Sequence, residues 1–117
     1  MKVDLSYLRE MSGGNKDLVL EMISIFKTQV DEFGGDMDHL LAEKKYDLLG
    51  KLAHKAKSSV SIMGLNELAT RLKELETSAC AGKNVASYKE IIELFKQETQ
   101  EAVKELDLIH ENIELYF

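Results

Sequence analysis

Apolar residues recur every three or four positions along almost the whole chain, which is the spacing of one face of an α-helix. Short stretches, most of which contain glycine or asparagine, separate five such segments, and none of the segments shows the alternation typical of a strand. The first follows Asp4, carries Leu5, Leu8 and Met11, and ends at the Gly13-Gly14 pair. Asn15 then stands where an N-cap is expected for the next helix.

The second predicted helix contains a glycine pair, Gly34-Gly35. Each glycine costs about 1 kcal/mol relative to alanine inside a helix. The apolar phase is nevertheless the same before and after the pair, which favours one continuous helix over two independent ones. Its apolar stripe consists of Leu18, Met22, Phe26, Val30, Phe33, Met37, Leu40 and Leu41.

Three more helices follow. One begins near Tyr46-Asp47 and is expected to end at Gly64 in a left-handed conformation. The next carries leucines at regular spacing from Leu65 to Leu75 and is closed by Gly82. The last is expected to be capped by Asn84 and to extend through Ile113, over about 45 Å if unbroken.

Short connections between the helices predict that neighbouring helices are antiparallel. The fold class is therefore all-α, an up-down-up-down antiparallel four-helix bundle with a short N-terminal lid helix, and residues 1–117 are expected to form a single domain.

Composition narrows the possible functions. The chain has 117 residues, no proline and a net charge of −6, which argues against a nucleic-acid partner. No apolar run is long enough for a membrane span. Cys80 is the only cysteine, so an internal disulfide is excluded, and this composition fits a reducing cytoplasm. We expect Cys80 itself to be a small packing residue rather than a reactive thiol. We expect a monomer, and the start at methionine favours a stand-alone protein over a domain of a hybrid kinase.

His54 stands out within the third predicted helix. The apolar stripe of that helix consists of Leu49, Leu52, Ala53, Ala56, Val60 and Met63. His54 points about 150° away from the centre of this stripe, so it is expected on the surface. Its helical neighbours there, Gly50, Ser58 and Ser61, are small and leave room for another protein.

The charge around His54 suggests a chemistry. Lys51, Lys55 and Lys57 make this segment positive within an acidic protein, which favours a phosphoryl group on or near the imidazole. A neutral imidazole nitrogen is a competent nucleophile. The alternative is an ordinary solvated histidine.

Two other histidines have spacings that are similar to those of metal sites in helical bundles, Asp36-x-x-His39 and Asp107-x-x-His110. Helical phase places His39 toward water and His110 at the edge of its stripe. We therefore expect both to be surface or boundary residues, and we expect no metal site.

The stretch from Ala53 to Ser59, followed by Gly64 and Leu68, resembles the signature of histidine-containing phosphotransfer (HPt) domains. In that family a lysine follows the histidine by three residues and a glycine follows it by ten, as Lys57 and Gly64 do here.

The resemblance extends along nearly the whole chain. The segment from Leu5 to Gly14 resembles the lid helix of the family, Phe26 fits its second helix, and Leu72 and Glu76 fit its fourth.

Two positions depart from the family pattern. Ser58 stands where glycine is usual, and its hydroxyl narrows access slightly and can hydrogen-bond to the carbonyl of His54. Ala56 stands where the family commonly has leucine. Both changes bear on partner choice and rate rather than on the nucleophile.

The resemblance implies a phosphorelay intermediate. Such a domain accepts a phosphoryl group from the aspartyl phosphate of a response-regulator receiver domain and passes it to another receiver. It has no kinase or phosphatase activity of its own, and a hybrid histidine kinase is a further possible partner. Mg²⁺ is expected on the receiver and no cofactor on this chain, which explains why no acid, base or metal cluster appears beside the histidine.

The implied roles can be assigned to individual residues. His54 is the phosphoacceptor, Lys57 neutralises phosphoryl oxygens, and Lys55 or Lys51 assists. The partner-binding surface is expected to comprise Gly50, Lys51, Ser58, Ser61 and Ile62, with packing under another helix as the alternative for Ile62. The main rival function is a non-phosphorylated helical adaptor that binds a receiver or kinase through the same surface. A metal-binding bundle is a third, more distant possibility.

Overall fold

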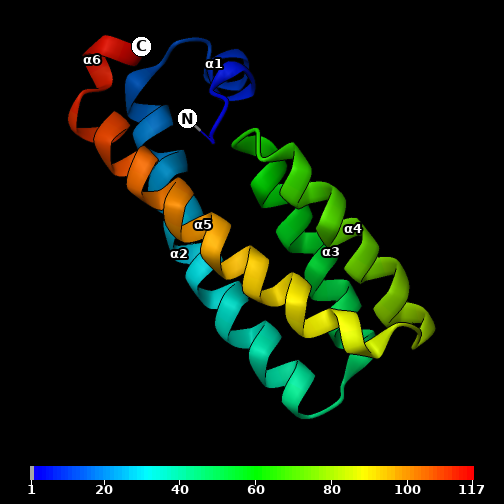
Figure 1. Cartoon of the computed structure of the whole chain (residues 1–117). Coiled ribbons are helices and arrows are strands. Elements are labelled where there is room, and N and C mark those ends of the chain that lie inside the picture. The colour runs from blue at the N-terminus through cyan, green and yellow to red at the C-terminus, as the bar shows by residue number, and fades with distance from the viewer. Residues whose placement is uncertain (1) are drawn as a thin grey trace.

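Four long helices run alternately up and down along the length of the protein (Figure 1). The computed structural model describes residues 2–117, so Met1, which the predicted domain includes, lies outside the described residues. The predicted all-α fold, with its antiparallel bundle and short N-terminal helix, is confirmed. The helices are α1 (Ser6–Ser12), α2 (Lys16–Ala42), α3 (Tyr46–Ile62), α4 (Asn66–Ala81), α5 (Tyr88–Glu111) and α6 (Ile113–Tyr116), with a short 3₁₀ turn η1 (Val85–Ser87) before α5. Within residues 2–117, none of these helices has the length and apolarity to cross a membrane.

Most predicted helix ends are confirmed. The residues that follow α1 and α4, Gly13 and Gly82, have φ values of 60° and 66°, and Gly64 after α3 has a φ of 75°. A left-handed residue at these places lets the chain leave a helix while its last carbonyls are still bonded. The Asn15 side chain accepts a hydrogen bond from the Leu18 amide at 3.1 Å, as expected of an N-cap.

The predicted ends of the last helix are wrong. Asn84 does not cap α5, because its own φ is 56° and η1 lies between it and the helix. Asn112 separates α5 from α6, so the helix has 24 residues and a length of about 36 Å rather than 45 Å. The Asn112 side chain donates a hydrogen bond to the Leu108 carbonyl at the point where α5 ends.

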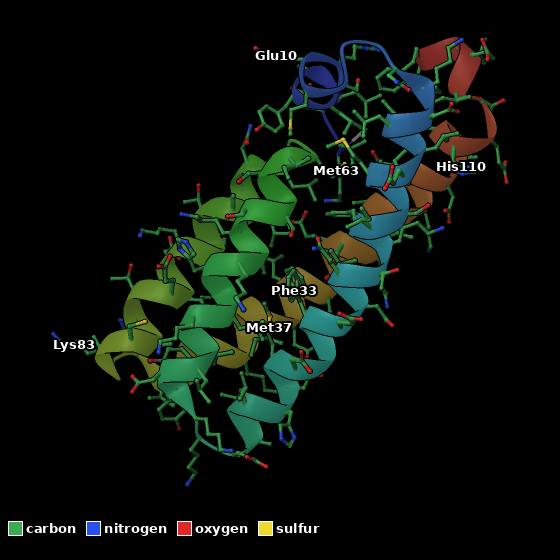
Figure 2. The ribbon with its side chains drawn as sticks, turned by 180° about the vertical axis from the view of Figure 1, so that it is seen from behind. Glu10, Phe33, Met37, Met63, Lys83 and His110 are labelled. Carbon is green, nitrogen blue, oxygen red and sulfur yellow. The ribbon has the colours of Figure 1, made fainter. Side chains whose placement is uncertain are left out.

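The core lies along the bundle axis and is built from one face of each helix. The apolar stripes predicted for α3 and α4 are buried, apart from Leu52, which is half-buried. In the first turns of α2 the prediction is wrong by one position, because Val19 and Ile23 are buried while Leu18 is exposed. Met11, predicted to be apolar packing in α1, is also exposed. Figure 2 shows Phe33 and Met37 farther along α2, where Met37 is fully buried as predicted.

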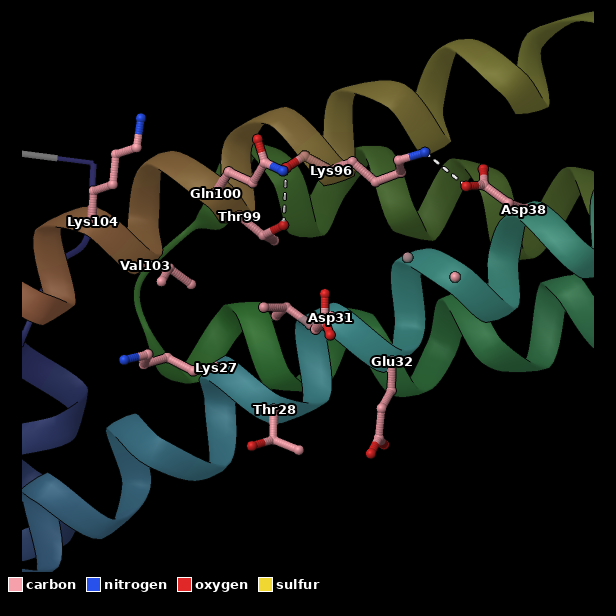
Figure 3. A pocket seen from close by; sticks show the side chains of 13 residues that line it. Lys27, Thr28, Asp31, Glu32, Asp38, Lys96, Thr99, Gln100, Val103 and Lys104 are labelled. Atoms are coloured by element: carbon pink, nitrogen blue, oxygen red, sulfur yellow. Dashed lines mark hydrogen bonds and ion pairs between the residues drawn. The ribbon is translucent and has the colours of Figure 1, made fainter.

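The α2 helix continues through Gly34 and Gly35, as its phase predicts. Gly34 is buried, and a Cβ built there would lie 3.3 Å from Cγ of Lys96 on α5. The stem of Lys96 therefore lies over the glycine, and its ammonium reaches Asp38 Oδ2 at 2.7 Å. This pair is part of a groove of about 770 Å³ between α2 and α5 (Figure 3).

Contacts on two sides hold the helix α1 against one end of the bundle. The Asp4 amide donates to the Met63 carbonyl at 3.0 Å, directly beside Gly64. On its other side, the Arg9 guanidinium donates to the Tyr116 carbonyl at 3.0 Å and lies over the Phe117 ring. The two ends of the chain are thus joined through α1 and α6, which lie at the same end of the bundle (Figure 1).

The docking of α1 can be tested by comparing two glycines. Both Gly64 and Gly82 have positive φ, so replacement of either by alanine costs about 1 kcal/mol of backbone strain. A Cβ at Gly64 would also lie 2.8 Å from the Asp4 amide nitrogen, whereas one at Gly82 meets nothing within 4 Å. We expect Gly64→Ala to lower the free energy of unfolding by about 3 kcal/mol in urea titrations. Equal losses for Gly64→Ala and Gly82→Ala would show that the Asp4 contact contributes nothing.

Candidate functional site

His54 lies on the outer face of α3, as its helical phase predicts. Its side chain is 58% exposed, while Ala53 and Ala56 beside it are fully buried. The imidazole therefore stands at the surface with the bundle core directly behind its helix.

A carboxylate from the neighbouring helix holds the imidazole. Glu76 on α4 lies with Oε2 3.0 Å from Nδ1 of His54. An ionised carboxylate only accepts hydrogen bonds, so Nδ1 carries the proton and donates it. This leaves Nε2 as the nitrogen with a free electron pair. The expectation that no acid lies beside His54 is wrong, because the sequence does not reveal which residue of α4 is level with it.

The charge of Glu76 is stabilised by its surroundings. Partial burial raises the pKa of this carboxyl, but the hydrogen bond from His54 and the positive charges of His54, Lys73 and Lys57 together lower it by more. Lys73 Nζ lies 3.6 Å from Glu76 Oε1. The resulting pKa is below the ordinary value, so at neutral pH the carboxylate remains ionised and can accept a hydrogen bond from Nδ1–H.

The three lysines singled out in the sequence lie on two sides of His54. Lys57, one turn along α3, is half-buried on the side of α4, where its charge acts on Glu76. Lys51 and Lys55 are exposed on the side of α2 and line a shallow hollow there with Asp36 and Leu48. Lys73 belongs to the same charged cluster as Lys57 but comes from α4, and no local pattern in the sequence singles it out.

Two small serine side chains leave the imidazole of His54 uncovered. Ser58 and Ser61 are both exposed, as predicted, and their hydroxyls bond back to α3 itself. Ser61 donates to the Lys57 carbonyl at 2.8 Å, and Ser58 donates to the His54 carbonyl at a longer 3.5 Å, the bond anticipated from its position. With the hydroxyls turned toward the backbone, neither side chain rises over the imidazole.

Two residues expected on the partner-binding surface are placed differently. Gly50 is buried against α4 and does not belong to the exposed face. Helical phase alone placed it beside His54, but the close approach of α4 covers that position. Ile62 is half-buried and packs against the core, which agrees with the alternative given for it.

The other two histidines lie away from this site. His39 is exposed, with Nε2 3.1 Å from Glu43, and His110 is exposed near the end of α5 (Figure 2). Among residues 2–117, no three His, Cys, Asp or Glu side chains gather where they could hold a metal ion. Cys80 is an exposed residue, with its sulfur directed at Gly50.

Comparison with protein families decides the assignment. The family model of the Hpt domain matches residues 21–107, which is more than half of the chain. The chain belongs to the Hpt domain family. Hpt domains are phosphocarrier modules of two-component signalling that interact with receiver domains and histidine kinases. No curated protein and no solved structure matches the chain.

The hydrogen bond between His54 and Glu76 should make the free energy of unfolding depend on pH. The pKa of Glu76 is lowered in the folded protein, so this group stabilises the fold above its ordinary pKa of 4.5 and loses that effect as the pH falls. We expect Glu76→Gln to lower the free energy of unfolding by about 1 kcal/mol at pH 7. In urea titrations the difference from wild type should begin to shrink below pH 4.5 and should disappear once the pH has fallen below the lowered pKa of the folded protein.

Glu74→Gln is the control for the loss of one negative charge from α4, because Glu74 faces Arg71 and not His54. A difference between wild type and Glu76→Gln that stayed constant from pH 7 down to acid pH would contradict the assignment of the ionised pair.

Proposed function

We propose that this chain carries a phosphoryl group on His54 between receiver domains of a phosphorelay. The observation that carries the proposal is the exposed imidazole whose Nδ1 proton is held by Glu76, so that Nε2 is free to react. The membership in the Hpt domain family supports the reaction class.

In the proposed transfer, the electron pair of Nε2 attacks the phosphorus of a receiver's aspartyl phosphate. The Nε2–P bond forms as the P–O bond to the aspartate breaks, and the aspartate leaves as a carboxylate with that electron pair. The ring keeps its Nδ1 proton and becomes a cation, which faces the Glu76 carboxylate. Transfer to the next receiver is the reverse of this step, so no proton has to enter or leave.

Positioning and charge neutralisation dominate the energetics of phosphoryl transfer. Lys57 lies one turn from His54, and we propose that its ammonium neutralises phosphoryl oxygens. Lys55 and Lys51 approach from the side of α2 and are proposed to assist. Mg²⁺ is expected on the receiver.

An apolar surface between His54 and the α1 end of the bundle is proposed to receive the partner. Ile25 on α2 is 49% exposed and lies one turn from Gln29, which accepts a hydrogen bond from Ser59 of α3. Since α2 and α3 are antiparallel, Ile25 is level with the last turns of α3, beyond Ser58. Leu18 is exposed two turns earlier on the same face of α2, and Tyr7 and Met11 are exposed on α1 at this end of the bundle.

Phosphotransfer can be separated from a purely adaptor role. Receiver domains encoded near this chain's gene are phosphorylated with labelled acetyl phosphate and mixed with wild-type protein. We expect acid-labile, base-stable label on the wild type and none on His54→Gln, because a phosphorylated imidazole has that stability pattern, whereas phosphoserine is stable to acid and an aspartyl phosphate is labile to base.

Binding of a receiver without transfer of label would reject the carrier and support the adaptor. Label retained by His54→Gln would place the phosphoryl group on another residue.

The proposed docking surface is tested with a matched pair of substitutions. We expect Ile25→Glu to weaken binding of the receiver by about tenfold, because it places a charge in an apolar contact. Leu108→Glu introduces the same charge at a position that is 59% exposed on α5 and should leave affinity unchanged. Isothermal titration with the same receiver measures both. Equal effects of the two variants would show that the added charge, and not the site, weakens binding.

A further inference from the structure

Near His54, the helix α4 lies very close to α3 at Gly50. A Cβ built on this residue would lie 2.6 Å from Cys80 Sγ, 3.1 Å from the Glu76 carbonyl oxygen and 3.2 Å from the Cys80 amide nitrogen. The first distance is too short for any real contact, so Cys80 would have to move, and at the other two distances the backbone of α4 would have to give by a few tenths of an ångström. Glycine therefore lets α4 lie closer to α3 than alanine would.

The contact between Gly50 and Cys80 lies one helical turn away from the hydrogen bond between His54 and Glu76, and both join α3 to α4. Gly50 precedes His54 by one turn of α3, and Cys80 follows Glu76 by one turn of α4. Because α3 and α4 are antiparallel, the separation of the two helices at Gly50 also sets their separation at His54. The 3.0 Å distance between Nδ1 and Oε2 depends on it.

We propose that Gly50 is a positioning residue for His54, and that it acts through Glu76. By letting α4 approach, it keeps the carboxylate within hydrogen-bond distance of Nδ1 and so fixes the ring tautomer in which Nε2 is free. This inference rests on the proposed phosphotransfer for its functional meaning, although the tautomer itself is independent of any phosphoryl donor.

The tautomer of His54 is read from ¹⁵N chemical shifts of its two ring nitrogens in histidine-labelled protein, with His54→Gln to assign the signals. We expect the Nδ1–H form to predominate in wild type and to lose its predominance in Gly50→Ala, as we also expect for Glu76→Leu, which removes the acceptor altogether. Gly35→Ala is the matched control, because a Cβ at this helical glycine meets nothing within 4 Å. It should leave the tautomer of His54 unchanged.

Relief of the collision provides a rescue. Cys80→Ala removes the sulfur that a Cβ at Gly50 would strike, so Gly50→Ala/Cys80→Ala should regain much of the wild-type tautomer. Cys80→Ala alone should resemble wild type. Failure of the double variant to recover any of the Nδ1–H form would overturn the proposal.

Reactivity is measured with phosphoramidate, which transfers its phosphoryl group to the imidazole with loss of ammonia and needs no receiver. We expect Gly50→Ala to react about tenfold more slowly than wild type, as displaced reacting groups do. Because Gly50 acts through Glu76, adding Gly50→Ala to Glu76→Leu should produce no further loss. Independent, multiplying losses would overturn the proposed route.

Folding of Gly50→Ala is verified by circular dichroism in sucrose, which favours the compact state. A folded variant with the wild-type tautomer would overturn the proposal, and so would a variant that stays unfolded, because Gly50 would then serve stability alone. If no receiver labels the wild type but the tautomer responds as expected, the phosphorelay is rejected while the positioning role of Gly50 stands.

Discussion

The close contact between α3 and α4 is the constraint on which the candidate site depends. Among the helices of residues 2–117, these two pack together most extensively, and Gly50 marks the point where no side chain separates them. An exposed histidine on a single helix would turn freely and share its proton between both nitrogens. At this distance a carboxylate from α4 reaches the ring and gives its two nitrogens different roles, although the ring itself remains open to solvent.

The opposite side of the bundle is packed differently. Between α2 and α5 the apolar contact is incomplete, and long side chains bridge the gap, such as Lys96 to Asp38 and Lys27 to Asp107. Such exposed ion pairs are worth little and tolerate movement. The bundle thus combines one tight helix pair, which fixes the geometry around His54, with a looser side that closes the core without determining the site.

The sequence predicted what depends on one helix and missed what depends on two. The exposure of His54 follows from the phase of α3 alone, so it could be predicted. The pairing with Glu76 and the burial of Gly50 depend on how α4 is aligned with α3, and no local pattern contains that alignment. In the first turns of α2, apolar residues occupy nearly every position, so periodicity could not choose Val19 over Leu18 as the buried one.

A negative side chain beside the proposed phosphate acceptor looks unfavourable in a protein that already has a net charge of −6. The geometry of the proposed transfer resolves this conflict. Glu76 is on the Nδ1 side of the ring and the phosphoryl group is on the Nε2 side, so the cationic ring stands between the two anions. Lys73 and Lys57 already offset the charge of the carboxylate, which weakens its repulsion of the incoming group. In the proposed transfer, Glu76 therefore stabilises the ring charge that forms when the phosphoryl group arrives. That charge is lost again when the group departs, which suits a domain proposed both to accept and to release it.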